Sequence, residues 1–82
     1  MAITYILYSE ILDKYYIGHT EQGMEERLRR HLSDHKGFSA KAKDWRIVFT
    51  KEFSEKTEAA AFERQIKSWK SRRRIARLIA GA

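Results

Sequence analysis

Five side chains in this sequence have the chemical types that metal-assisted hydrolysis of a phosphodiester requires. They are Tyr5, Tyr16, Arg27, His31 and Glu63. A phenol can accept or relay a proton from water when a nearby cation or metal lowers its pKa. The planar fork of an arginine matches phosphate oxygens. A carboxylate can hold Mg²⁺, which typically takes one or two carboxylates and completes its shell with water and substrate phosphate.

Each residue also has an ordinary structural explanation. A strand tyrosine is most often a half-buried packing residue with its hydroxyl at the rim. Arg27 and His31 are one turn apart on a segment that also carries pairs such as Glu25–Arg29, as on a surface helix. Glu63 stands four residues before Lys67, the favourable order for a simple ion pair. The ordered set, rather than any one member, therefore indicates chemistry.

The histidines outside this set have weaker claims. His19 and His35 lack cysteine partners, and three histidines alone form no recognisable zinc-ligand pattern. One glutamate such as Glu63 is enough for a metal site that DNA completes, although one glutamate alone predicts nothing.

Two strands must position the tyrosines. Residues 3–8 and 14–19 are rich in β-branched and aromatic residues, and residues 9–13 are short enough to join them as an antiparallel hairpin. Such a hairpin can bring both phenols to one site. Gly18 is expected to end the second strand with backbone angles that a larger residue would resist.

The strand pattern also predicts which face Tyr5 shares. Because side chains alternate along a strand, Tyr5 lies on the same face as Ile3 and Leu7, and its neighbours point the other way.

Helices are predicted before and after a third strand along the chain. From about Thr20 to Asp34 apolar residues recur every four positions, which indicates a helix. Residues 35–44 are expected to form a loop or one short helix, and residues 45–53 a strand. Thr57 or Ser54 can cap the helix that follows.

The C-terminal region is either one long helix or two short ones. Apolar residues from Ala59 to Trp69 share a helix face, and a second apolar stripe follows the run Arg72-Arg73-Arg74, with no proline to mark a break. The elements give an α+β fold, a small three-stranded antiparallel sheet flanked by helices. Their order is strand, strand, helix, an optional short helix, strand, helix, helix.

Length and composition predict one small domain over residues 1–82. The chain is 43% hydrophobic with ten aromatic residues, which is ordinary for a globular domain and too apolar for a disordered one. It has no cysteine, no apolar run of about 20 residues and no secretory signal at its start, so a cytoplasmic protein is the default expectation.

The net charge of +6 is concentrated at the end of the chain. Residues 1–63 carry ten basic and eleven acidic side chains, whereas residues 64–82 carry seven basic and no acidic ones. This stripe favours binding to a phosphate backbone, although a solvated basic helix or a membrane-surface segment has the same composition. The predicted nucleic-acid-binding residues are Lys67, Lys70, Arg72, Arg73, Arg74 and Arg77.

Nearly the whole chain resembles the GIY-YIG nuclease domain. The resembling segments, in family order, are Ile3-Thr4-Tyr5, Tyr16-Ile17-Gly18, Arg27-Leu-Arg-Arg-His31 and Glu58-Ala-Ala-Ala-Phe-Glu63-Arg-Gln-Ile-Lys67. The chain looks most like the small stand-alone members related to the N-terminal domain of the bacterial excinuclease C subunit. It departs from the pattern by having Ile3-Thr4 in place of Gly-Ile. It also has no asparagine, which many members place near the end of the domain, so Ser68, Ser71 or the backbone would have to substitute.

The resemblance implies a role for each residue of the set. Tyr5 would be the general base or would position the attacking water, and Tyr16 would hydrogen-bond in the same site. Arg27 would hold the scissile phosphate, and His31 would be a hydrogen-bond partner or proton carrier. Glu63 would bind a single Mg²⁺ or Mn²⁺ ion, which would neutralise the leaving group and activate water.

Three functions remain open from the sequence. The first is a metal-dependent DNA endonuclease with a role in DNA repair or recombination. It would select DNA by its structure, through backbone charge and shape. The second is a non-catalytic nucleic-acid-binding module using the basic C-terminal helix. The third is a protein-interaction domain with an incidental basic helix. A partner protein could supply targeting, and the oligomeric state is open.

Overall fold

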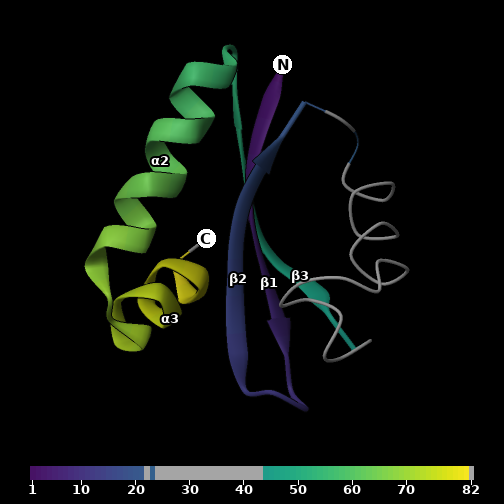
Figure 1. Ribbon diagram of the computed structural model, residues 1–82, viewed down its shortest axis with the longest axis vertical. Helices are drawn as coiled ribbons and strands as arrows, with labels where there is room; N and C mark the ends of the chain where they lie inside the picture. The colour runs from purple at the N-terminus through teal and green to yellow at the C-terminus, as the bar shows by residue number, and fades with distance from the viewer. Residues whose placement is uncertain (22, 24–43, 82) are drawn as a thin grey trace.

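Three strands form one antiparallel sheet in the computed structural model, which describes residues 1–21, 23 and 44–81. Within these residues the sheet order is β2-β1-β3, so β2 and β3 are its edges. The strands are β1 (Ala2–Ser9), β2 (Lys14–Thr20) and β3 (Arg46–Phe53). The helices α2 (Lys56–Trp69) and α3 (Arg72–Ala80) lie together on one face of the sheet (Figure 1).

The predicted α+β class and three-stranded antiparallel sheet are confirmed. The helix predicted from about Thr20 to Asp34 lies almost wholly outside the described residues, as does the loop or short helix predicted for residues 35–44. The C-terminal region forms two helices, and neither is long and apolar enough to cross a membrane.

The β1–β2 hairpin closes through a tight loop between Ser9 and Lys14, which are the last paired residues. Asp13 has a φ of 51°, a left-handed conformation that aspartate tolerates better than most residues. Its backbone N–H donates to the carbonyl of Glu10 at 3.2 Å. The hairpin predicted from the short spacing of the two strands is therefore present.

Asp13 also joins the hairpin to the end of the chain. Its carboxylate accepts the Tyr8 hydroxyl at 2.6 Å and both terminal nitrogens of Arg72 on α3, at 2.7 and 3.1 Å. The hydrogen bonds from Arg72 and then from Tyr8 lower the pKa of Asp13 from 3.8 to about 2. Arg72 thus connects α3 to the hairpin whether or not it also meets nucleic acid.

Acid is expected to weaken this connection. Because the folded pKa of Asp13 lies below its unfolded value, its contribution to stability is present above pH 3.8 and is lost as the pH falls through about 2. Asp13→Asn should therefore lower the melting temperature at neutral pH, and the difference from wild type should shrink as the pH falls towards 2. Thermal unfolding across this range measures the effect. A difference that is the same at every pH would contradict it.

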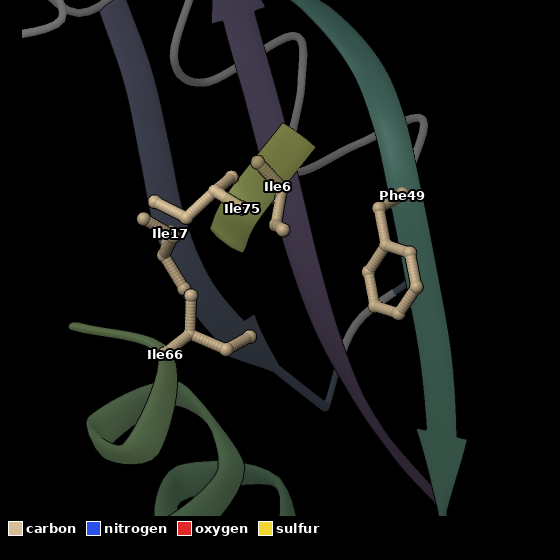
Figure 2. Close-up of a cluster of buried hydrophobic side chains, with 5 residues drawn as sticks. All are labelled: Ile6, Ile17, Phe49, Ile66 and Ile75. Atoms are coloured by element: carbon tan, nitrogen blue, oxygen red, sulfur yellow. The ribbon is translucent and has the colours of Figure 1, made fainter. Parts of the chain in front are cut away.

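The main core lies between the sheet and the two helices. Figure 2 shows Ile6 of β1 and Ile17 of β2 lying near Ile66 of α2 and Ile75 of α3, with Phe49 of β3 to one side. All five side chains are buried. The helices contribute few fully buried residues, so the contacts of Ile66 and Ile75 with the sheet provide much of the packing that holds α2 and α3 to it.

Thr4 fastens α2 to β1 through a polar contact inside this core. Its hydroxyl donates to the carbonyl of Ala59 at 2.8 Å, and both residues are fully buried. Ala59 stands one helical turn before Glu63. The Thr4 side chain therefore helps to place the turn that carries Glu63.

Removing this hydroxyl is expected to destabilise the protein. In Thr4→Val the carbonyl of Ala59 keeps its place in the helix ladder, so the cost should be that of one buried hydrogen bond, about 1 kcal/mol. For a domain of this size that corresponds to a melting temperature lower by about 4–8 °C. Thr50→Val, at an exposed position of β3, is the matched control and should have little effect. Equal effects of the two changes in calorimetry would contradict the role of Thr4.

The start of α2 differs from the prediction. Its N-cap is Glu55, with no side-chain capping bond, rather than Thr57 or Ser54. The Ser54 hydroxyl instead donates to Glu58 at 3.2 Å, and Thr57 lies inside the helix with its hydroxyl towards Glu55. Each hydroxyl therefore interacts with a nearby carboxylate and does not accept a backbone N–H at the start of the helix.

The break between the two helices needs no proline. Lys70 takes a left-handed conformation with a φ of 49° and ends α2. Ser71 then caps α3, because its hydroxyl accepts the backbone N–H of Arg74 at 3.3 Å. The serine before the arginine run is the sequence signal for this second helix start.

Candidate active site

Tyr5 and Tyr16 lie on the same face of the sheet, where the hairpin brings them together. In the β1–β2 register Tyr5 pairs with Gly18, and Leu7 pairs with Tyr16. Because Thr4 and Ile6 face the helices, this set faces away from α2 and α3. Tyr5, Leu7 and Trp45 are buried there as a second cluster, and Tyr16 packs against it.

The surroundings of the two phenols differ. Tyr5 has no solvent-exposed surface, whereas Tyr16 is half-buried. The ring of Tyr16 meets the ring of Trp45 nearly edge-on, with centroids 6.2 Å apart. Trp45 comes directly before β3, so the third strand supplies one wall of this cluster.

Gly18 is required for a different reason than the sequence indicated. It lies inside β2 rather than at its end, and its φ is not in the positive range. A Cβ at this position would lie 2.5 Å from the Tyr5 hydroxyl and 2.7 Å from its Cζ. The glycine is therefore needed because the Tyr5 ring crosses directly over it.

Glu63 stands on the other face of the sheet, on α2. Its Oε1 lies 2.5 Å from Nδ1 of His19 on β2, and its Oε2 accepts the Lys67 ammonium at 2.7 Å. Only 16% of its side chain is exposed. Partial burial acts to raise the pKa of Glu63, but the hydrogen bonds from Lys67 and His19 outweigh it, so the pKa lies below its usual value. The carboxylate is therefore ionised at neutral pH.

His19 is the contact that the sequence did not single out. It pairs with Thr4 across the two strands, and it shares the helix-facing side of β2 with Ile17. A signal for it existed, because a polar residue that alternates with a buried isoleucine must face the same covering helix. His19 holds the candidate metal ligand from the sheet, while Lys67 holds it from its own helix.

The two groups of residues meet at one point of β2 from opposite faces. Gly18, beneath the Tyr5 hydroxyl, is followed directly by His19, which holds Glu63. Both groups adjoin β2, which is an edge strand of the described sheet. The structure therefore brings Glu63 near the strand that carries the second tyrosine motif, but not onto the tyrosine face.

The role of Glu63 as ligand of a single divalent metal ion stays a prediction, and both of its carboxylate oxygens have partners, His19 at Oε1 and Lys67 at Oε2. Among the described residues no group of three His, Cys, Asp or Glu side chains could hold a metal. An ionised glutamate can serve alone when water and phosphate supply the remaining oxygens. The Lys67 ammonium at Oε2 occupies one side of this carboxylate and would have to turn away.

The remaining members of the predicted set are Arg27 and His31, which lie outside the described residues. Their roles stay predictions. The serines proposed to replace the missing asparagine both serve helix structure: Ser68 donates to the carbonyl of Gln65 at 2.7 Å, and Ser71 caps α3.

The basic C-terminal residues have unequal surroundings. Lys67 and Arg72 are joined to Glu63 and Asp13, respectively. The guanidinium of Arg74 lies over the ring of Trp69, 4.5 Å from its centroid. Lys70, Arg73 and Arg77 are exposed, and α3 has no acidic residue. Their predicted part in nucleic-acid binding is consistent with this exposure and stays a prediction.

Comparison with known proteins gives a match to the GIY-YIG catalytic domain over residues 1–76. No significant match to a curated protein or to a solved structure was found. The match spans nearly the whole chain and includes every residue of the predicted catalytic set. This family consists of nuclease-type domains, generally endonucleolytic, which implies a DNA substrate. The chain therefore belongs to the GIY-YIG catalytic domain family.

Proposed function

We propose that this protein is a divalent-metal-dependent DNA endonuclease whose reaction takes place at the β2 edge of the sheet. The observation that carries the proposal is the ionised Glu63 carboxylate, held by His19 in a chain of a nuclease family. His19 follows Gly18 in β2, and the Tyr5 ring crosses Gly18 on the opposite face of the sheet. Structure-selective cleavage in DNA repair or recombination is part of the proposal.

In the proposed reaction water attacks the phosphorus and one ester oxygen leaves. Tyr5 takes the proton of the attacking water or orients that water, and Tyr16 donates a hydrogen bond in the same site. Arg27 holds the scissile phosphate, with His31 as its hydrogen-bond partner or a proton carrier. Glu63 would hold one Mg²⁺ or Mn²⁺ ion, which would neutralise the leaving oxygen and activate water.

The burial of Tyr5 sets a condition on this reaction. A general base must touch the water that it activates, and Tyr5 has no exposed surface. DNA binding would therefore have to open the tyrosine face before proton transfer. On the other face Lys67 would release Oε2 of Glu63 and could then turn to a phosphate oxygen.

The test is cleavage of plasmid, branched and single-stranded DNA with Mg²⁺, with Mn²⁺ or with a chelator. The wild type should cut at least one of these substrates only when the metal is present. Glu63→Gln, purified in parallel, should cut none of them. If wild type and variant cut equally, the activity belongs to a contaminant and the proposal is wrong.

A non-catalytic nucleic-acid-binding module is the second candidate function. The observation that favours it is the exposed arginine face of α3, which contains Arg73 and Arg77 and no acidic residue. It predicts binding that weakens steeply with salt, without cleavage in any divalent metal. Salt-dependent binding together with an intact substrate panel would favour this function over the first.

A further inference from the structure

A pocket lies beside the first half of β2, away from Glu63. This open pocket, of about 310 Å³, separates the first half of β2 from the junction of α2 and α3. The residues that line it are Asp13, Lys14, Tyr15, Ile17, Lys70, Ser71, Arg72 and Ile75. None of them belongs to the group formed by His19, Glu63 and Lys67. The volume is at the lower end of the range for small-molecule sites, enough for one flat group of about the size of a nucleobase.

The walls of this pocket suit a flat, aromatic group. Tyr15 is half-buried against the core, and Ile17 and Ile75 are buried members of that core. The Tyr15 ring is fixed by its neighbours, because Tyr8 packs 5.0 Å away and Arg72 lies over it at 5.7 Å. A ring that is already held in place loses little freedom when a base stacks on it.

The rim of the pocket suits an anion. Lys14, Lys70 and Arg72 supply three positive charges, and Asp13, paired with Arg72, supplies one negative charge. Within the described part of the chain, no ion pair is formed by Lys14 or Lys70. An aromatic wall and a cationic rim together match one nucleotide, with the base inside and the phosphate at the rim.

The pocket lies in line with the candidate metal ligand. Tyr15, Ile17 and His19 alternate along β2 and share its helix-facing side. His19 stands four positions after Tyr15 along the strand, which corresponds to roughly 13 Å. That length corresponds to about four stacked nucleotides of one DNA strand, and fewer when the strand is extended.

We infer that this pocket holds one unstacked nucleotide of the DNA strand, a few nucleotides from the phosphate at Glu63. The inference rests on the proposed function, because it takes DNA as the substrate. Unstacking a base costs least when the base is unpaired. The pocket would therefore make the protein prefer DNA with a bulged or single-stranded nucleotide near the cut.

The experiment compares two labelled duplexes that differ only in one bulged nucleotide. Binding is measured by fluorescence anisotropy with the full chain and a chelator, which prevents metal-dependent cleavage. The wild type should bind the bulged duplex about five- to tenfold more tightly, as expected when one base stacks on an aromatic ring. With 2-aminopurine as the bulged base, its emission should change when protein is added.

Variants identify the pocket as the source of this preference. Tyr15→Leu should remove both the preference and the emission change, whereas Tyr15→Phe should keep them. Lys14→Gln, at an exposed position where folding is not at risk, should weaken binding to the bulged duplex. Lys51→Gln and Phe53→Leu on β3 are the matched controls and should leave the preference unchanged.

The outcomes separate this inference from the nuclease proposal. Equal binding of the two duplexes, or a preference that Tyr15→Leu and Lys14→Gln both leave intact, would overturn the pocket. Cleavage of the same duplexes with Mg²⁺ is measured separately. If the protein binds the bulge through Tyr15 but does not cut DNA, the nucleotide pocket is supported and the nuclease proposal is contradicted. If it cuts both duplexes equally and Tyr15→Leu has no effect, the nuclease proposal is supported and the nucleotide pocket is contradicted.

Discussion

Replacing Glu63 by glutamine is expected to lower the rate of DNA cleavage by more than about a hundredfold. The loss of an outer partner of a metal ligand typically costs about 10–100-fold in metal affinity or activity, and Glu63 is the proposed ligand itself. Glutamine has the same shape and can still accept a hydrogen bond from Lys67, so the fold should survive. Cleavage assays give the rate, and calorimetric titration with Mn²⁺ gives the metal affinity without depending on activity.

Variants of His19 and Lys67, the two residues that hold Glu63, provide effects with which the loss in Glu63→Gln can be compared. His19→Ala keeps the carboxylate but removes its partner on β2, so it should cost less, about 10–100-fold. Lys67→Met removes a cation 2.7 Å from Oε2 and should tighten Mn²⁺ binding by the free protein. If Glu63→Gln binds Mn²⁺ as well as the wild type does, Glu63 is not the ligand.

The Glu63 group shows what the sequence could predict about the site. The spacing of Glu63 from Lys67 predicted the ion pair that is present, whereas the metal-binding role of Glu63 stays a prediction. The partner across the fold was missed, because the alternation with Ile17 places His19 on the helix-facing side of β2 but does not say which helix residue it meets. Its contact depends on α2 packing over β2, a relation between residues 44 positions apart.

The fold was predicted more completely than the site because its signals are local. Strand composition, the short hairpin spacing and the apolar periodicity of α2 are each signals that span a few residues. The strands, the hairpin and α2 that they predicted are all present. Arg72 illustrates the opposite case. Its run of positive charge indicated nucleic acid, but its guanidinium binds Asp13, 59 positions away, and no local pattern encodes that contact.

Gly18→Ala is expected to destabilise the protein, although the same change inside most strands is stabilising. Alanine usually gains about 0.5–1 kcal/mol over glycine, because glycine loses more backbone freedom on folding. Here the added Cβ would lie 2.5 Å from the Tyr5 hydroxyl and 2.7 Å from its Cζ. The ring is fully buried and cannot swing into solvent, so the strain should exceed this gain. A net loss of about 1–3 kcal/mol, the usual cost of overpacking, should appear as a lower melting temperature.

The matched control is Gly23→Ala, where no atom lies within 4 Å of the added Cβ, and which should not destabilise the protein. A rescue variant then distinguishes the Tyr5 contact from a backbone effect. In the double variant Tyr5→Leu, Gly18→Ala, the shorter side chain no longer crosses residue 18, so the alanine should cost less than it does beside Tyr5. This non-additivity is expected for two residues in direct contact. If the cost of Gly18→Ala is the same with Tyr5 and with leucine at position 5, the close approach of the ring is not the reason for the glycine. The backbone of β2 would then have to supply that reason.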